Sequence, residues 1–364
     1  MSRKTGIKSF EEMRQALIAI EKQTQKDKLE KAKRAEMIKE IRTDIDAVKQ
    51  TDNNLMLKEL EYNGRSKAIA SMMTRNRCSV SQLIDYVTAA FREDSLSLDD
   101  LKKIRKIFKS LLEKNAVLEK EKRKQQENRE LKEIINSRKI ESLIHFTRTE
   151  NLDSILSIGI LPRLMLETRN IPFIYNDSLR ADYMNSCTCV SIEFPNTWVL
   201  NNKMDMAPNS DWVLIVLKAE LLYEQRNYYA KHNAATYSVQ KNLRARYKPA
   251  DLEALFADNI KIEKASGEIK EFKRIDTQAY FPTSDQAEIL VEGAINPKYI
   301  DFVVFKTESS MGKYERILKS KGIECISNSD LFLHNRYDLN GKKGEKWLRR
   351  KFFSAMKKKY MKRN

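Results

Sequence analysis

The contrast between the first 140 residues and the remainder of the chain most constrains how this sequence folds. From Phe10 to Val48 there is no Gly or Pro, and Ala, Glu, Lys, Gln and Ile dominate, which predicts one long helix. At Ile140 the pattern changes, and short β-prone runs follow, such as Thr188–Phe194 and Trp212–Leu217. We therefore predict an α+β chain in which an all-α, partly coiled-coil-like N-terminal domain precedes a mixed-sheet domain.

The helical part carries apolar residues at heptad spacing only at the two ends of its first segment. Met13, Leu17 and Ile20 form one set, and the residues from Ile38 to Val48 form the other. Polar residues occupy the four core positions between the two sets, which a continuous two-stranded coiled coil does not tolerate. The pattern predicts either a helical hairpin arm or a solvated helix with apolar ends.

Two further helices are predicted in the same region. One begins at Ser81 and carries Leu83, Ile84, Val87 and Phe91. The other begins at a capping box that Ser97 opens, with Asp100 in place of the usual Glu. Its apolar face comprises Leu101, Ile104, Phe108, Leu111 and Leu112.

Charge is distributed unevenly along the 364 residues, whose net charge is +17. Residues 1–140 hold 33 Lys and Arg against 23 Asp and Glu, residues 341–364 hold 11 against one, and the middle holds 24 against 27. A near-neutral body between two basic segments predicts a polyanionic partner, most often nucleic acid, with a membrane surface or a ribosome as alternatives. We predict a basic helical module at 1–136, a catalytic domain at 137–340 and a basic tail helix at 341–364.

The sequence also bears on location and metal binding. No run of 18 apolar residues occurs, so no membrane span is expected, and the charged N-terminus has no apolar signal core. The four cysteines are scattered, and Cys187-x-Cys189 lacks the spacing of a metal site. We expect a cytoplasmic protein with reduced thiols and no metal.

A single carboxylate, Glu288, is the strongest candidate for catalysis. It follows the turn Phe281–Ala287 and opens the apolar run Ile289–Val291, which Gly293 ends. A strand is expected there, with Glu288 at the rim where side chains reach a cleft. By the local pattern alone, a solvated glutamate at the start of a strand is the commoner outcome.

Several tracts, read in order, resemble the DarT family of bacterial NAD-dependent ADP-ribosyltransferases, which modify bases of single-stranded DNA. The tracts are His145-Phe146-Thr147-x3-Asn151-Leu152-x2-Ile155-Leu156-x2-Gly159-Ile160-Leu161-Pro162-Arg163, then Asn176-Asp177-x2-Arg180, and Asp285-Gln286-Ala287-Glu288-Ile289-Leu290-Val291. Shorter matches in the same order are Ser191-Ile192-x-Phe194-Pro195-Asn196, Asp211-Trp212-Val213 and Asn233-Ala234-Ala235. The resemblance covers roughly residues 141–335.

The resemblance implies a split β-sheet domain of the ADP-ribosyltransferase type that uses NAD as its substrate and no metal. It implies a toxin that transfers ADP-ribose to a base of single-stranded nucleic acid as part of a toxin–antitoxin or phage-defence system. DNA is the favoured acceptor, with RNA as the alternative. The expected partners are single-stranded DNA or RNA and an antitoxin, either a macrodomain hydrolase or a direct inhibitor. A protein acceptor and a non-catalytic nucleic-acid-binding scaffold are weaker alternatives.

Residue roles follow from the same resemblance. Glu288 matches the catalytic glutamate, and cleavage of the nicotinamide–ribose bond passes through an oxocarbenium-like state that a carboxylate stabilises. Arg180 matches an arginine that contacts cofactor phosphate or polarises the acceptor base. His145 and Thr147 match the pair that holds nicotinamide and its ribose. Asn151 is expected either to bind the adenosine side or to cap the next helix, and Arg163 is assigned to the NAD site.

Three other features remain open. The long polar insertion Ser238–Thr283 is predicted to be a partly mobile lid or a spacer. Within it, Tyr247 lies among Arg244, Arg246 and Lys248, a combination typical either of a single-strand-binding surface or of a charged loop. His232 is expected to lie on the surface, or else to face the acceptor. The tail segment Trp347–Tyr360 predicts a basic helix that binds a polyanion or folds back on its domain.

Overall fold

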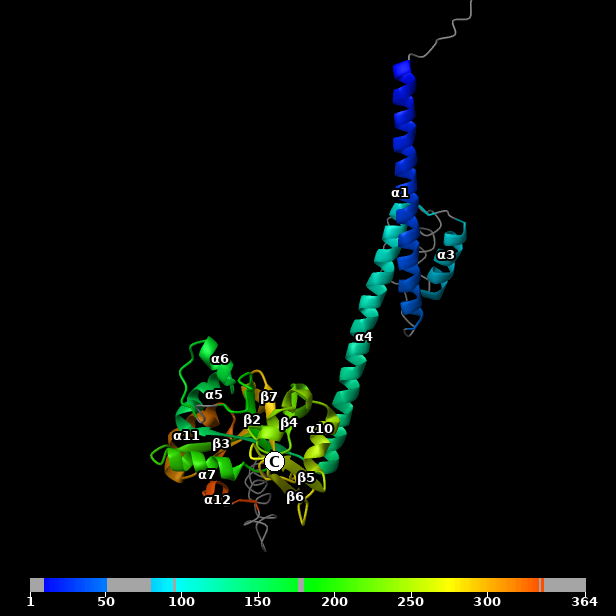
Figure 1. Ribbon diagram of the computed structural model, residues 1–364. Coiled ribbons are helices and arrows are strands. Elements are labelled where there is room, and N and C mark those ends of the chain that lie inside the picture. The colour runs from blue at the N-terminus through cyan, green and yellow to red at the C-terminus, as the bar shows by residue number, and fades with distance from the viewer. Residues whose placement is uncertain (1–9, 51–79, 94–95, 176–179, 334, 337–364) are drawn as a thin grey trace, which may run out of the picture. The chain divides into compact units, whose positions relative to one another are not determined.

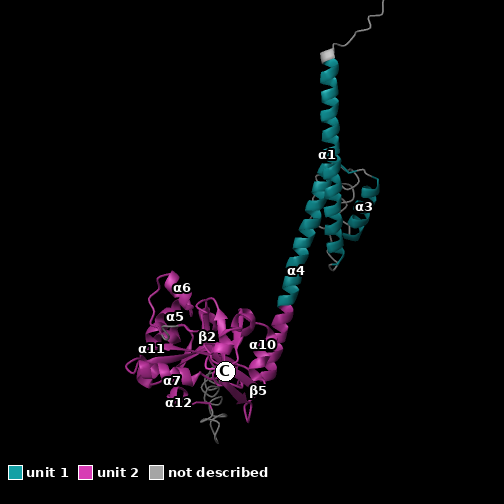
Figure 2. Ribbon diagram, viewed as in Figure 1, with its two compact units in different colours: residues 1–124 teal, residues 125–364 magenta. Residues whose placement is uncertain are grey.

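The computed structural model describes residues 10–50, 80–93, 96–175, 180–333 and 335–336 (Figure 1). The chain forms two compact units, Met1–Lys124 and Gln125–Asn364 (Figure 2). The predicted basic tail at 341–364 lies outside the described residues, as do Asn176 and Asp177 of the second family-like tract. None of the helices that the structure describes combines the length and apolar character needed to span a lipid bilayer.

Unit 1 contains α1 (Phe10–Lys49), α3 (Val80–Arg92) and the first part of α4 (Leu98–Arg138). The predicted long helix is confirmed as α1. Its second half contributes to a core with α3 and α4, since Ile41, Ile45 and Val48 are buried there. The apolar residues of its first half, from Met13 to Leu29, are exposed. This arrangement agrees with the solvated-helix alternative rather than with a continuous coiled coil.

The capping box predicted at the start of α4 is confirmed. The Ser97 hydroxyl accepts the backbone N–H of Asp100 at 3.2 Å, and the Asp100 carboxylate accepts the N–H of Ser97 at 3.2 Å. Asp can replace Glu in this motif because both carboxylates reach back to the N-cap N–H. The helix then continues unbroken to Arg138, through the charged Glu119–Glu130 stretch.

Unit 2 is built on a seven-stranded sheet. Its strands are β1 (Ser142–Arg148), β2 (Cys187–Ile192), β3 (Trp212–Lys218), β4 (Asn227–Ala230), β7 (Glu288–Glu292), β8 (Ile300–Phe305) and β9 (Glu324–Ser327). The order is β4-β7-β2-β1-β3-β8-β9, and all pairs are antiparallel except β8–β9. The α+β class is confirmed. The short strands β4 and β9 had no predicted counterpart.

The sheet is split between its two central strands. β1 pairs with β3 along all seven of its residues, whereas β1 and β2 pair only through Leu143↔Ile192 and Ile144↔Ser191. Beyond these pairs β2 instead follows β7. The two half-sheets, β1-β3-β8-β9 and β2-β7-β4, are therefore joined at one end and separate toward the other, as the predicted split-sheet class requires.

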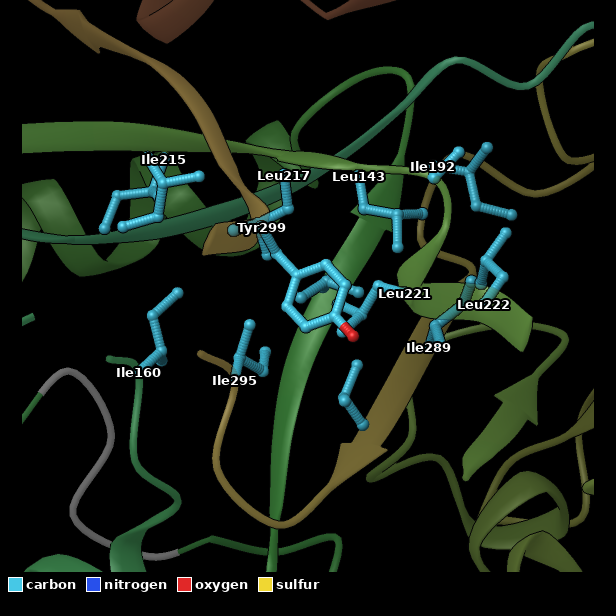
Figure 3. Close-up of a cluster of buried hydrophobic side chains, with 14 of the residues drawn as sticks. Leu143, Ile160, Ile192, Ile215, Leu217, Leu221, Leu222, Ile289, Ile295 and Tyr299 are labelled. Atoms are coloured by element: carbon cyan, nitrogen blue, oxygen red, sulfur yellow. The ribbon is translucent and has the colours of Figure 1, made fainter. Parts of the chain in front are cut away.

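Alternation along the strands divides the apolar residues between the two faces. Leu143, Ile215 and Leu217 lie in the largest core, with Ile192 and Ile289 from the other half-sheet (Figure 3). Their sequence neighbours Ile144, Leu214 and Val216 lie in a second core on the opposite face. This period of two is the geometry of a sheet covered on both faces. The covering helices include α5 (Leu152–Ile158), α7 (Thr197–Met206), α8 (Leu221–Glu224), α11 (Glu308–Ser320) and α12 (Asp330–Leu333). The short helix α6 (Arg163–Thr168) has no buried residue.

The insertion Ser238–Thr283 is folded, so the prediction of a long lid or spacer loop is wrong. It contains α9 (Tyr237–Gln240), η2 (Leu243–Ala245), α10 (Pro249–Glu253), η3 (Ala254–Phe256) and the hairpin β5 (Asn259–Glu263) and β6 (Ile269–Lys273). Its apolar residues include the run Ala254–Ala257 and the alternating pair Ile260 and Ile262, and they join the cores of the domain. Leu252, Leu255 and Ile260, for example, are each at most 2% exposed.

Candidate active site

A cavity of about 230 Å³ opens where β1 and β2 separate. Its walls come from both strands, from the segment 159–163 before and into α6, from the loop 172–175 and from Glu288. All six predicted site residues line it: His145, Thr147, Asn151, Arg163, Arg180 and Glu288. The split of the sheet thus brings together residues that are up to 143 positions apart in the sequence.

Glu288 is the first residue of β7, and its carboxylate is held at both oxygens. The backbone N–H of Ala234 donates to Oε2 at 2.8 Å, and the Asn196 side-chain amide donates to Oε1 at 3.3 Å. Burial raises the pKa of Glu288 to about 7, the hydrogen bond from Ala234 opposes that rise, and the negative charge of Asp182 adds to it. A carboxyl group with a pKa near neutrality can exchange protons at working pH.

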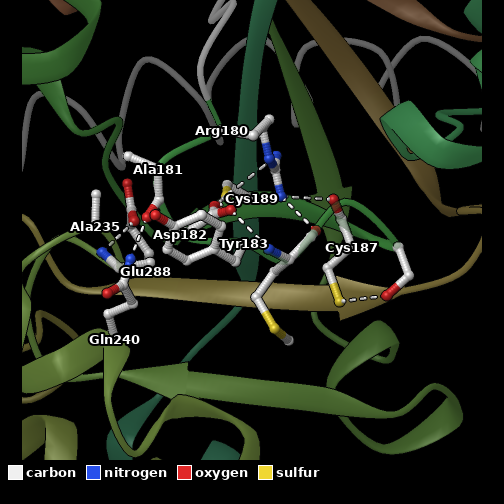
Figure 4. Close-up of polar contacts among 12 residues, drawn as sticks. Arg180, Ala181, Asp182, Tyr183, Cys187, Cys189, Ala235, Gln240 and Glu288 are labelled. Carbon is white, nitrogen blue, oxygen red and sulfur yellow. Dashed lines mark hydrogen bonds and ion pairs between the residues drawn. The ribbon is translucent and has the colours of Figure 1, made fainter.

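Arg180 is fixed in an uncommon backbone conformation, with φ of +43°. Its Nη2 donates to the carbonyl oxygens of Met184 at 2.6 Å and Cys187 at 3.1 Å, and it lies 3.2 Å from the Asp182 carboxylate (Figure 4). Its Nε is buried and has no hydrogen-bond partner among the described residues. A buried N–H donor without an acceptor is costly, which points to a ligand as its partner.

His145 lies in β1 with its ring against the backbone of β2. Its Nδ1 is 2.9 Å from the carbonyl oxygen of Cys189. Because a carbonyl only accepts, Nδ1 carries the hydrogen and Nε2 is the bare nitrogen. Burial lowers the pKa of His145, the hydrogen bond to Cys189 opposes this, and the charge of Arg180 adds to it. The ring is therefore neutral at the pocket wall.

Asn151, which immediately precedes α5, connects that end of the pocket to the loop 172–175. Its amide donates to the Thr147 hydroxyl at 3.0 Å and to the carbonyl of Ile174 at 3.0 Å, and its oxygen accepts the N–H of Ile174 at 2.9 Å. It makes no side-chain capping bond to α5. The capping alternative is therefore wrong, because a loop distant in sequence occupies both ends of the amide.

Arg163 is the first residue of α6 and lines the pocket. Its Nε donates to Glu167 at 2.7 Å, and its guanidinium lies 4.6 Å from the centre of the Tyr175 ring. The hydrogen bond with Glu167 raises the pKa of Arg163. A permanent positive charge is thereby held at the pocket with Tyr175 packed on it.

Three groups at the site escaped sequence reasoning. Asn196 and Ala234 lie in tracts that match the family, but nothing local indicates that they bind a carboxylate 92 and 54 residues away. Asp182, two residues after Arg180, also accepts the N–H of Met184 at 2.9 Å. The two-residue spacing between Arg180 and Asp182 could have indicated this ion pair. The group that a backbone N–H donates to cannot be inferred from a sequence.

One prediction near the site needs correction. His232 is 6% exposed, so its expected place on the surface is wrong. A hydrogen bond to Ser284 and packing against Phe272 account for its burial. In the basic cluster around Tyr247, the ring stacks with Arg226 at 4.3 Å, and Arg246 lies 4.0 Å from Asp251. Its role as a single-strand-binding surface or a charged loop stays a prediction.

Metal ligation has no candidate in the described part of the chain, where no cluster of three His, Cys, Asp or Glu side chains is suitably placed. The site instead offers a carboxylate, a neutral imidazole and two guanidinium groups around an apolar-walled cavity. This combination, at the opening of a split sheet, suits the binding of an anionic nucleotide.

Comparison with known proteins identifies the family. The profile described as "ssDNA thymidine ADP-ribosyltransferase, DarT" matches residues 144–328, half of the chain. The protein belongs to the DarT family and is an NAD-dependent ADP-ribosyltransferase. No curated protein sequence matches it.

The similar solved structures include three structures of two DarT proteins. Thermosipho africanus DarTG in complex with ADP-ribose is 15% identical, with 52% of this chain and 50% of that chain covered and a TM-score of 0.39. Thermus sp. 2.9 DarT with NAD+ is 14% identical, with 52% and 96% covered and a TM-score of 0.34. The same protein with ADP-ribosylated ssDNA is 14% identical, with 52% and 95% covered and a TM-score of 0.35. The match thus spans half the length of the Thermosipho chain.

Proposed function

We propose that this enzyme transfers ADP-ribose from NAD to thymidine in single-stranded DNA, and that it acts as a toxin. The observation that carries the proposal is the position of Glu288, with its pKa of about 7, in one pocket with His145 and with Arg180, whose Nε has no hydrogen-bond partner among the described residues. The family description supports thymidine as the acceptor.

Thymidine suits a carboxylate with this pKa. The only N–H of its base must lose a proton as the nitrogen bonds to the ribose carbon. In the transfer, the bond between that carbon and nicotinamide breaks, its electron pair remains on the nicotinamide nitrogen, and the acceptor proton goes to Glu288. A general base is most effective when its pKa lies near the working pH. The N–H groups of Ala234 and Asn196 orient the carboxylate for this step.

The other pocket residues are suited to hold NAD. In this proposal the neutral His145 and Thr147 face nicotinamide and its ribose, and Arg163 contributes charge for the diphosphate. Asn151 shapes the adenosine side through its bonds to the 174 backbone. Arg180 Nε donates either to a phosphate oxygen or to a carbonyl of the acceptor base, and planar guanidinium suits both acceptors.

The acceptor is tested with radiolabelled NAD and purified enzyme. Single-stranded DNA oligonucleotides with one thymidine are compared with matched thymidine-free oligonucleotides, with the duplex and with the corresponding RNA. Label is expected only on the thymidine-containing single strand, and Glu288→Ala is expected to abolish it. Equal labelling of the thymidine-free strand, or labelling of RNA alone, would contradict the DNA–thymidine proposal.

The toxin role predicts that expression halts growth, because a modified template blocks replication. An antitoxin is then expected, either a macrodomain hydrolase that removes the modification or an inhibitor that binds the enzyme, in a toxin–antitoxin or phage-defence setting. Growth is compared between cells that express the intact chain and cells that express the Glu288→Ala form. High-level production of active enzyme without harm and without a companion protein would contradict this role.

A further inference from the structure

Behind the pocket lies a buried polar pair that contributes nothing to the pocket wall. His232 Nδ1 is 2.7 Å from the Ser284 hydroxyl oxygen, and the two residues are 6% and 0% exposed. His232 follows the end of β4, whereas Ser284 begins the turn that leads into β7. One hydrogen bond therefore joins the two segments that meet at Glu288.

Both ends of this hydrogen bond are a few residues from the Glu288 carboxylate. On one side, Ala230 pairs with Glu288 across the β4–β7 ladder, and two residues after His232 the N–H of Ala234 donates to Oε2. On the other side, the Ser284 hydroxyl accepts the N–H of Gln286 at 3.2 Å, within the turn that ends at Glu288. A shift of either segment would move the Ala234 N–H relative to the carboxylate.

The protonation state of the pair is defined by its surroundings. Burial lowers the pKa of His232 to about 4, and the positive charge of Lys270 on β6 adds to the effect. The ring is therefore neutral at physiological pH. The tautomer of the ring sets the direction of the hydrogen bond: the Ser284 hydroxyl donates to a bare Nδ1, or a protonated Nδ1 donates to the hydroxyl oxygen. The ring of Phe272, also on β6, packs at 4.7 Å between centroids and restricts the imidazole orientation.

We propose that His232 and Ser284 are positioning residues for ADP-ribosyl transfer, whose hydrogen bond holds the Ala234 N–H against the Glu288 carboxylate. The inference rests on the proposed role of Glu288 as proton acceptor. An N–H donor to an ionised carboxylate makes one of the stronger hydrogen bonds in proteins, and its strength depends on close alignment. A purely structural role for the pair would instead predict a loss of stability alone.

The main test compares Ser284→Ala with Thr283→Val, a matched control one position earlier. Each substitution removes a buried hydroxyl group that makes two hydrogen bonds. Ser284 bonds to His232 and accepts from Gln286, whereas Thr283 donates to the carbonyl of Ala257 at 2.6 Å and accepts from Arg274 at 3.5 Å. Ser284→Ala is expected to lower kcat by roughly 10–100-fold and to leave the KM for NAD nearly unchanged, because small displacements at a reacting group act on the chemical step. Thr283→Val is expected to lower the melting temperature and to leave kcat unchanged.

The pH profile of kcat tests the proposal separately from stability, because a loss of folding stability alone does not shift the acid limb. The Ala234 hydrogen bond lowers the pKa of Glu288, and so does Arg180, whereas burial and Asp182 raise it. Loss of that bond should move the acid limb of the kcat profile to higher pH in Ser284→Ala only. A ¹³C NMR titration of the Glu288 carboxyl group should show the same shift in the absence of turnover.

Substitutions of His232 test the other partner in the hydrogen bond with Ser284. In His232→Asn the side-chain amide can either accept from or donate to the Ser284 hydroxyl in place of Nδ1, so kcat and the acid limb should stay close to those of the wild type. His232→Leu cannot accept, and it should behave as Ser284→Ala does. Ser284→Ala with a wild-type kcat and acid limb, or with losses equal to those of Thr283→Val, would overturn the inference.

Glu288→Gln keeps the two proposals distinguishable. If that variant is inactive while Ser284→Ala is normal, the positioning role fails and the proposed function stands. If Glu288→Gln retains turnover, the role of Glu288 fails first. In that case the NMR titration still reports whether Ser284 holds the Ala234 hydrogen bond in place.

Discussion

At the residue scale, Glu288 combines burial with two hydrogen-bond donors and a neighbouring negative charge. Replacement by Gln keeps the shape and removes the charge. We expect Glu288→Gln to lower kcat by roughly 10²–10³-fold, the effect typical of losing one group that acts mainly in the transition state. The Kd for NAD should change little. Steady-state kinetics with calorimetric titration of NAD measure the two quantities.

The matched control for that substitution is Glu292→Gln. Glu292 is the last residue of the same strand, where it is exposed and lies 3.7 Å from Arg226. Its replacement should leave kcat and the NAD affinity close to those of the wild type. Near-normal turnover by Glu288→Gln would contradict the proposed mechanism.

The raised pKa of Glu288 predicts how activity depends on pH. Only the deprotonated carboxylate accepts a proton, so kcat should rise tenfold per pH unit below pH 7 and level off above it. A measured pH–rate profile without an acid limb near pH 7 would exclude Glu288 as the base. Burial lowers the pKa of His145 from the ordinary imidazole value, so its charge change is displaced to lower pH.

The same pKa predicts how stability depends on pH. Folded Glu288 holds its proton up to about pH 7, whereas the unfolded chain releases it near the ordinary value of 4.5. Its contribution to stability is therefore lost as pH rises from 4.5 to 7. We expect Glu288→Gln to gain melting temperature relative to the wild type at pH 8 and not at pH 4. An equal difference at both pH values would contradict this linkage.

At the element scale, the close approach of the segment after α5 to the segment after β7 shapes one wall of the pocket. Gly159 has φ of +90°, and a Cβ there would lie 2.2 Å from the carbonyl oxygen of Ile295. Next to it, Ile160 and Ile295 form an isolated antiparallel bridge. Only glycine satisfies both the backbone angle and the contact.

Gly159→Ala should therefore be severely destabilising. Left-handed strain and the forced separation from Ile295 together should cost about 3 kcal/mol or more of unfolding free energy. Gly267→Ala, in the β5–β6 turn, is the matched control, since φ is +81° and nothing lies within 4 Å of the added Cβ. It should cost only about 1–2 kcal/mol. Urea unfolding of both variants tests this, and equal losses would show that the Ile295 contact is unimportant.

At the scale of the whole molecule, the excess of positive charge and the candidate catalytic residues lie in different parts of the sequence. The middle of the chain holds 24 Lys and Arg against 27 Asp and Glu, whereas residues 341–364 hold 11 against one. The six residues proposed for the active site all lie in the middle region. Binding of a polyanion and catalysis are therefore expected to depend on different parts of the sequence.

Removal of residues 341–364 should weaken binding of single-stranded DNA more than it slows turnover at saturation. Each lost phosphate contact should flatten the slope of log affinity against log salt by ~0.7, so four contacts change it by about 3. NAD hydrolysis without acceptor should persist. Titrations at several salt concentrations, with a thermal melt of each protein, measure these effects. An unchanged slope with a large loss of melting temperature would show that the tail packs on its domain instead.

Local patterns in the sequence determined much of this protein. The stretch without Gly or Pro predicted α1, the Ser97 capping box predicted the start of α4, and apolar runs predicted β2, β3 and β7. Periodicity, caps and strand-forming residues act over a few positions, so they can be recognised without the fold. The candidate pocket residues came from tracts that resemble a known family, and the structure places all six around one cavity.

Tertiary structure alone decided the environment that gives Glu288 its chemistry. The N–H of Ala234 and the amide of Asn196 reach its carboxylate only because β4 and β2 lie beside β7 in their observed register. The burial of His232 against Ser284 and the folding of the 238–283 insertion depend on the same long-range packing. A backbone N–H has no residue identity, and the partner of a buried polar group is set by strands far apart in sequence. Neither can be inferred from local pattern.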